Sequence, residues 1–180
     1  MGDMAEIRSI RLLQVLLSLL LILSSTIGAV ASAEPNEEAV SVRVVSIVDG
    51  DTLVIEGSRL ESMRLRLIGI DAPEMAQPQG KQARERLLEL ALGQEGQLIR
   101  AGQDRYGRVL GVMSVGGVDL AADLLRQGLA WYYRPCSGRR FVAACENYRK
   151  AEERARHQQI GIWADRHREA PWKWRYRQRH

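Results

Sequence analysis

The chain has 180 residues, of which 27% are charged and 46% hydrophobic, and its formal net charge is +4. This length suits one domain of ordinary size with an N-terminal extension. The balance of charged and hydrophobic residues excludes a disordered chain, a collagen-like repeat and a polytopic membrane protein. The small positive charge is compatible with a polyanionic partner but does not by itself indicate one.

Residues 1–33 have the features of an export signal. Two arginines precede an apolar run over residues 12–23, and residues 31–33 have the A-x-A form of a signal peptidase site. We therefore expect an exported protein, periplasmic or secreted, whose mature chain begins at Glu34. The alternative is a membrane anchor over residues 12–30, since this stretch approaches the length of a bilayer span.

The two cysteines, Cys136 and Cys145, lie nine residues apart in the part of the chain that would be exported. In an oxidising compartment, an isolated pair of this kind is most simply a disulfide. A zinc site would need further cysteine or histidine ligands, and no histidine lies within ten residues of either cysteine.

The mature chain predicts five strands and three helices after a loose acidic leader over residues 34–40. Period-two alternation predicts strands over residues 41–48, 52–56, 63–70, 97–101 and 108–115. Amphipathic runs that end at glycines predict helices over residues 81–92, 119–127 and 146–159. Residues 49–51 are expected to form a tight turn between the first two strands, in which Gly50 is free to adopt a positive φ. This order is compatible with an α+β domain over residues 41–165, built on a five-stranded OB-fold β-barrel with about three helices.

Five charged side chains are expected at strand ends or turns, namely Asp51, Arg66, Asp71, Glu74 and Arg108. Asp51 and Asp71 are short carboxylates that can converge on one hard cation. Arg66 faces the same way as Asp71 only if the strand is interrupted between them, and Gly69 is the natural place for the interruption. Two guanidinium groups beside three carboxylates suit a phosphodiester, whose oxygens they can clamp while a carboxylate activates water. Each motif alone is most simply a turn, and only the whole set is specific.

Four motifs together resemble the staphylococcal-nuclease-like (thermonuclease) family over roughly residues 42–163. They are VDGDT, RLIGIDAPE, DRYGR and LLRQGLA, in this order. The resemblance implies an OB-fold and calcium-dependent hydrolysis of the phosphodiester bonds of DNA and RNA, with 3′-phosphate products.

The resemblance also implies a role for each matching position. The Ca²⁺ ligands would be Asp51, Asp71 and the backbone carbonyl of Ala72. Glu74 would position or deprotonate the attacking water. Arg66 and Arg108 would bind the phosphate and the charge that develops in the transition state.

Residues 166–180 form a basic tail with six lysines or arginines, one acid and interleaved aromatic residues. Alternation over residues 172–177 is compatible with an edge strand or an extended segment that has its aromatic rings on one face. Such rings and cations suit nucleic acid, because bases stack on rings and phosphates pair with cations. The alternative is a docked tryptophan anchor with a solvated basic end. The candidate nucleic-acid contacts are Tyr132, Tyr133, Trp172, Lys173, Trp174 and Arg175.

The leading functional hypothesis is an exported Ca²⁺-dependent nuclease that acts on DNA, RNA or both as a monomer, without a stable protein partner. One alternative is a non-catalytic OB-fold module that only binds nucleic acid, and the presence of all five charged residues argues against it. A second alternative, a membrane-anchored adhesion or scaffold module, would require residues 1–33 to remain attached.

Overall fold

The computed structural model describes residues 39–58, 61–134, 136 and 138–179, all within the compact unit formed by residues 37–180. The expected export signal over residues 1–33 and most of the expected leader lie outside this part of the chain, so they stay predictions. Within the described ranges, no helix combines the length and the apolar character needed to cross a membrane.

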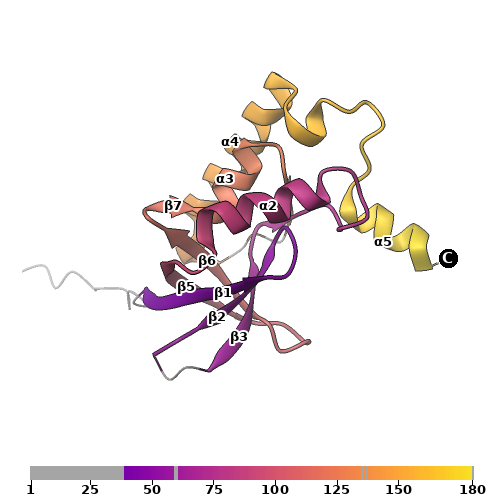
Figure 1. Cartoon of the computed structure of the whole chain (residues 1–180). Coiled ribbons are helices and arrows are strands. Elements are labelled where there is room, and N and C mark those ends of the chain that lie inside the picture. The colour runs from indigo at the N-terminus through magenta and orange to yellow at the C-terminus, as the bar shows by residue number, and fades with distance from the viewer. Residues whose placement is uncertain (1–38, 59–60, 135, 137, 180) are drawn as a thin grey trace, which may run out of the picture. The chain divides into compact units, whose positions relative to one another are not determined.

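Five strands close into the predicted barrel (Figure 1). They are β1 (Val40–Ile47), β2 (Thr52–Glu56), β3 (Ser62–Leu67), β5 (Glu95–Gln103) and β6 (Val109–Val115). Neighbouring strands run antiparallel in the order β3-β2-β1-β5-β6, and a parallel pairing of β3 with β6 joins the two ends. Closure removes the unpaired strand edges, and a closed five-stranded barrel of this kind is an OB-fold. The α+β prediction is confirmed.

Helices and short strand pairs surround the barrel. The α-helices of the described residues are α2 (Gly80–Ala91), α3 (Leu120–Arg126), α4 (Val142–Gln158) and α5 (Pro171–Arg179). The short strands are β4 (Ile70–Asp71), which pairs with β8 (Trp131–Tyr132), and β7 (Val118–Asp119), which pairs antiparallel with the end of β6. Single 3₁₀ turns cover Arg139–Phe141 and Gly161–Trp163. The first three helices match the three predicted ones to within a few residues.

One hydrophobic core lies between the barrel and helices α2, α3 and α4. Leu53, Leu65 and Met113 point inward from three strands and are fully buried, as a period-two pattern requires. Leu87 of α2 and Tyr148 of α4 are part of the same core and are equally buried. The barrel is therefore a rigid support for the side chains that stand at the ends of its strands.

The C-terminal segment is a helix, and not the edge strand or extended segment with which the alternation over residues 172–177 was compatible. Pro171 occupies the first helical position, where its fixed φ and missing N–H favour a helix start. The backbone N–H groups of Lys173 and Trp174 donate to the carbonyl oxygen of Ala170 at 2.9 and 3.0 Å. These local bonds override the alternation of aromatic and basic residues.

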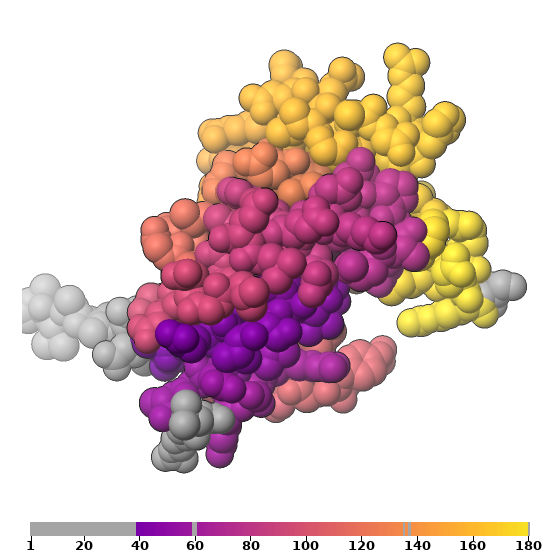
Figure 2. Space-filling view, in the orientation of Figure 1, coloured from indigo at the N-terminus to yellow at the C-terminus, as the bar shows by residue number. Residues whose placement is uncertain are grey.

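Helix α5 is held against the domain by Trp172. The Trp172 ring lies 5.6 Å from the ring of Trp131 and 5.6 Å from the ring of Tyr133, measured between centroids. Figure 2 shows the yellow C-terminal segment against the magenta segment that leads into α2, and a hydrogen bond from Gln77 to the carbonyl oxygen of Glu169 joins the two. The alternative of a docked tryptophan anchor therefore describes this segment.

The predicted disulfide between Cys136 and Cys145 is present, with an S–S distance of 2.05 Å. It ties the segment that follows β8 to the first turn of α4.

Candidate functional site

Neighbouring strand ends bring Asp51, Arg66 and Asp71 to one edge of the barrel. Asp51 directly precedes β2, Arg66 lies in β3, and Asp71 ends β4. Strands β2 and β3 pair with Thr52 opposite Arg66, and the N–H of Leu67 donates to the carbonyl oxygen of Asp51 at 3.0 Å. The convergence predicted from residues at strand ends is thus found in the structure.

Arg66 bridges the two aspartates. The chain turns between β3 and β4 at Gly69, whose φ is 75°, and this is the interruption that the sequence predicted. Arg66 Nη1 lies 2.9 Å from Asp51 Oδ2, and Arg66 Nη2 lies 3.1 Å from Asp71 Oδ1. Nη1 also donates to two backbone carbonyl oxygens of the turn, each at 3.1 Å. The guanidinium is therefore fixed in its direction before any ligand arrives.

Gly50 allows the turn that carries Asp51 to approach its neighbours closely. Gly50 is free to adopt a positive φ, but it is not among the glycines of the described chain that do so. A Cβ at this position would lie 2.7 Å from the Cβ atoms of both Ala72 and Ala83, closer than side chains can pack. The close approach lets the N–H of Ala72 donate to Asp51 Oδ2 at 2.8 Å.

The two aspartates are buried and lie against guanidinium groups, Asp51 against Arg66 and Asp71 against both Arg66 and Arg175. Asp51 is 6% exposed and Asp71 is 1% exposed. The pKa of Asp51 is raised to about 7, mainly by burial and also by the nearby Asp49 and Asp71, while Arg66 and the N–H of Ala72 act in the opposite direction. An additional cation at this position would offset both effects.

Glu74 lies in the segment between β4 and α2, and Gln77 fixes its backbone. The N–H of Glu74 donates to Gln77 Oε1 at 2.9 Å, and its carbonyl oxygen accepts from the N–H of Gln77 at 2.8 Å. A Cβ on Gly80 would lie 2.0 Å from the same carbonyl oxygen, so the chain is tightly folded here. The position of Glu74 is thus set by short-range bonds.

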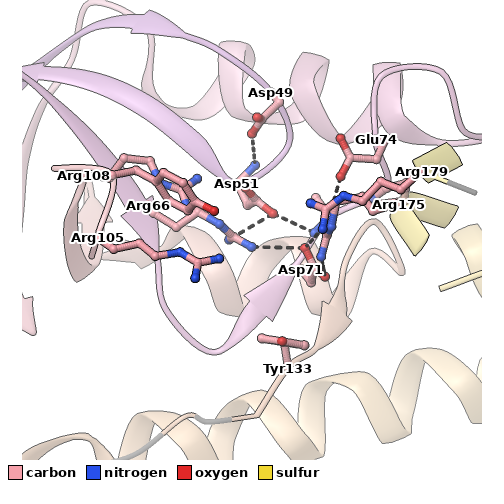
Figure 3. Close-up of a pocket in the computed structure, with 13 residues that line it drawn as sticks. Asp49, Asp51, Arg66, Asp71, Glu74, Arg105, Arg108, Tyr133, Arg175 and Arg179 are labelled. Atoms are coloured by element: carbon pink, nitrogen blue, oxygen red, sulfur yellow. Dashed lines mark hydrogen bonds and ion pairs between the residues drawn. The ribbon is translucent and has the colours of Figure 1, made fainter. Parts of the chain in front are cut away.

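Arg108 approaches from the opposite side, on the hairpin between β5 and β6 (Figure 3). Gly107 makes the predicted sharp turn with a φ of 78°. Asp104 then fixes the direction of the side chain, because its Oδ2 accepts from Arg108 Nε at 2.8 Å and its Oδ1 accepts from the Arg108 N–H at 3.0 Å. The DRYGR motif therefore supplies both the arginine and the acid that positions it.

These groups line one cavity of about 480 Å³. All five predicted charged side chains contribute to it, namely Asp51, Arg66, Asp71, Glu74 and Arg108. Arg105, Tyr106, Tyr133, Arg175 and Arg179 line it as well. Among the aromatic and tail residues proposed as nucleic-acid contacts, Tyr133 and Arg175 line the cavity. Tyr132 packs on the core, Trp172 packs on Trp131, and Trp174 lines a second, smaller cavity.

Arg175 is the functional feature that sequence reasoning missed. The sequence suggested it as a nucleic-acid contact, but in the structure its guanidinium lies between two of the acids. Arg175 Nη2 is 2.8 Å from Asp71 Oδ2, and Arg175 Nη1 is 2.7 Å from Glu74 Oε1. No sequence spacing indicates this contact, because Arg175 and Asp71 are 104 residues apart.

The donor set suits a hard divalent cation such as Ca²⁺. Asp51 and Asp71 offer carboxylate oxygens at one edge of the barrel, and both contact the guanidinium of Arg66. In the part of the chain that the structure describes, no group of three histidine, cysteine or acidic side chains could hold a metal. A cation here would therefore use backbone oxygen and water in addition to the two carboxylates, as hard cations commonly do.

Comparison with known proteins identifies the family. Residues 64–165, more than half of the chain, match the family model described as staphylococcal nuclease homologue. The chain is 40% identical over 141 residues to "Micrococcal nuclease" of Shigella flexneri, covering 73% of this chain and 78% of that protein. It is 35% identical over 162 residues to an "Uncharacterized endonuclease" of Haemophilus influenzae, covering 90% and 85%.

A plant relative is similar to this chain over only part of its own length. The chain is 36% identical over 119 residues to "Staphylococcal-like nuclease CAN1" of Arabidopsis thaliana, covering 66% of this chain and 35% of that protein. The four-motif resemblance, the OB-fold and these relatives agree, and they support a nuclease function. The chain therefore belongs to the staphylococcal nuclease family.

Proposed function

We propose that this chain is a calcium-dependent nuclease that hydrolyses phosphodiester bonds of DNA, RNA or both and leaves 3′-phosphates. The observation that carries the proposal is the gathering of all five predicted charged side chains around one cavity at the edge of the barrel. Two fixed guanidinium groups and three carboxylates in one site match what a phosphodiester and an attacking water require. Nuclease relatives of the same family support the reaction class.

The arginines act on the phosphate. Arg66 and Arg108 are held by acids from two sides of the cavity, so a phosphate between them meets donors that are already oriented. Preorganised donors stabilise charge as it develops in the transition state, and each is typically worth about 10²–10³ in rate.

Glu74 is the proposed general base. Its carboxylate takes a proton from a water molecule, whose oxygen attacks phosphorus while the bond from phosphorus to the 5′-oxygen breaks. The 5′-oxygen leaves and takes up a proton from water, Glu74 returns its proton to water, and the phosphate stays on the 3′-oxygen. A well-placed base typically contributes about 10²–10⁴ in rate.

Asp51, Asp71 and the backbone carbonyl of Ala72 are the residues that would hold Ca²⁺. When bound, the ion supplies positive charge to the phosphate oxygens and makes a bound water more acidic. The placement of both carboxylates in the lining of one cavity supports this assignment, since carboxylate oxygens that converge in this way can bind one hard cation.

Digestion of denatured DNA by the purified protein tests the proposal. Cleavage is expected with Ca²⁺ and not with a chelator, and Glu74→Gln is expected to lower the rate by about a hundredfold or more. Analysis of the product ends is expected to find 3′-phosphates. Glu85→Gln, the same substitution at an exposed position of α2, is the matched control and should keep full activity. Cleavage that persists in chelator, or that survives Glu74→Gln undiminished, contradicts the mechanism.

We also propose that the protein is exported. The disulfide between Cys136 and Cys145 supports this, because such bonds persist in oxidising compartments. Mass spectrometry of the intact protein recovered from outside the cytoplasm is expected to give the mass of a chain without residues 1–33. Recovery of the uncleaved chain in the membrane fraction would favour the anchored alternative.

A further inference from the structure

The guanidinium of Arg175 occupies the place of a cation in the site. It forms a two-pronged contact with Asp71, with Nη1 at 3.2 Å from Oδ1 and Nη2 at 2.8 Å from Oδ2. The same Nη1 lies 2.7 Å from Glu74 Oε1. Both oxygens of Asp71 are therefore engaged by Arg175, and the proposed base is neutralised by the same group.

Helix α5 carries Arg175 and is packed against the rest of the domain. The ring of Trp172 packs on Trp131 and Tyr133, three residues before Arg175 along the helix. The segment that leads into α5 is tied down as well, because Gln77 Nε2 donates to the carbonyl oxygen of Glu169 at 3.0 Å. Figure 3 shows Arg175 entering from α5, on the side of the cavity away from Arg108.

The local charges explain why the contact forms. Four acids line the cavity, namely Asp49, Asp51, Asp71 and Glu74, and Arg66 is already shared between Asp51 and Asp71. Arg175 adds a second guanidinium at Asp71 and pairs with Glu74 as well. A divalent cation that binds Asp71 would compete with Arg175 for the same oxygens.

We propose that Arg175 is an internal cation that competes with the catalytic metal, so that α5 sets the Ca²⁺ concentration at which the site becomes active. This inference rests on the proposed function, since it assumes that Asp71 is a Ca²⁺ ligand. Binding of Ca²⁺ moves the guanidinium away from Asp71 and Glu74. The base is thereby released only in the metal-loaded site.

Calcium binding without nucleic acid gives the test. Isothermal titration with CaCl₂ is performed on the wild type, on Arg175→Gln and on Arg177→Gln. Arg177→Gln is the matched control, because Arg177 lies on the same helix as Arg175 but pairs with Glu169, which does not line the cavity. Arg175→Gln is expected to lower the Kd for Ca²⁺ by about fivefold or more, because a charge a few ångströms away is removed. Arg177→Gln is expected to leave the Kd unchanged.

A second variant tests the same competition through the docking contact. Trp172→Ala removes the ring that holds α5, so it is expected to lower the Kd in the same direction as Arg175→Gln. Thermal unfolding without Ca²⁺ verifies that each variant is folded, and added Ca²⁺ should raise the melting temperature of Arg175→Gln more than that of the wild type.

The possible results separate this inference from the proposed function. Equal or weaker Ca²⁺ binding in Arg175→Gln overturns the competition while the calcium site stands. Equal tightening in Arg177→Gln also overturns it, because the effect would then be one of total charge. Absence of Ca²⁺ binding in the wild type and in Arg175→Gln overturns both proposals. Binding that is measurable only in Arg175→Gln supports both.

Discussion

The side chain of Gln77 joins Glu74 to the segment that precedes α5. Gln77 Oε1 accepts from the backbone N–H of Glu74 at 2.9 Å, and Gln77 Nε2 donates to the carbonyl oxygen of Glu169 at 3.0 Å. Gln77 is 6% exposed, so neither bond is readily replaced by water. One amide therefore fixes both the proposed base and the helix that carries Arg175.

Gln77→Ala is expected to affect stability and activity together. Two backbone groups lose their partner, and each buried unsatisfied group costs about 1–3 kcal/mol. Because Glu74 is then less well positioned, the rate of cleavage should fall by about 10–100-fold. Urea unfolding and digestion of denatured DNA measure the two effects. Gln82→Ala, at an exposed position of α2, should change neither, and an unchanged rate in Gln77→Ala would contradict the positioning role.

Gly50→Ala is expected to destabilise the fold by about 1–3 kcal/mol, the usual cost of overpacking. The added Cβ would lie 2.7 Å from Cβ atoms of Ala72 and Ala83, so the turn that carries Asp51 must move. Urea unfolding measures the loss, and Ca²⁺ affinity should fall with it. Gly57→Ala is the control, because its nearest neighbour, Met63 Cε, would lie at an ordinary 3.9 Å. If the two variants are equally stable, close packing at Gly50 does not matter.

Arg108→Ala and Arg66→Ala are expected to differ in stability although both lose activity. Each should lower the cleavage rate by about 10²–10³-fold, as for a preorganised donor. Arg108 pairs with Asp104 on an accessible hairpin, so its loss should cost little stability. Arg66 bridges two buried acids, and breaking such a pair typically costs about 3–5 kcal/mol. Rates and thermal unfolding of both variants check this, and near-wild-type turnover in either would remove that arginine from the site.

The barrel and the five charged residues could be predicted from the sequence because they depend on local patterns. Period-two alternation identified the barrel strands, and the interruption at Gly69 followed from the positions of Arg66 and Asp71. Gly50 has a role that local patterns do not reveal. A glycine in a turn is free to adopt a positive φ, yet the actual constraint at Gly50 is its close approach to Ala72 and Ala83, which only the folded chain defines.

The conformation of residues 171–179 could not be predicted from the sequence, because it too depends on contacts in the folded chain. Alternating aromatic and basic residues favour an extended segment when only local pattern is considered, whereas Pro171 starts a helix once Trp172 has a surface to pack on. The contact of Arg175 with Asp71 depends on that docking and on the convergence of Asp71 and Glu74 at the same edge of the cavity. Both are tertiary properties, so neither leaves a signal in residue spacing.

The raised pKa of Asp51 predicts a specific dependence of stability on pH. Burial raises this pKa from 3.8 to about 7, so between these values the folded protein holds a proton that the unfolded chain has lost. Stability from this group is therefore present at low pH and is lost as the pH rises to about 7. In chelator, the free energy of unfolding of the wild type relative to Asp51→Asn should fall by more than about 1.4 kcal/mol, the equivalent of one pKa unit, from pH 4 to pH 7.5.

Saturating Ca²⁺ supplies the control for this titration. A bound cation favours the charged carboxylate, so the fall in wild-type stability relative to Asp51→Asn should shrink or reverse when Ca²⁺ replaces chelator. Urea unfolding at a series of pH values, with and without Ca²⁺, measures both curves. A difference between wild type and Asp51→Asn that stays constant with pH in chelator would mean that Asp51 is already compensated by Arg66 and by the Ala72 N–H. In that case the buried pair would need no further cation, and the assignment of Asp51 as a metal ligand would lose its physical basis.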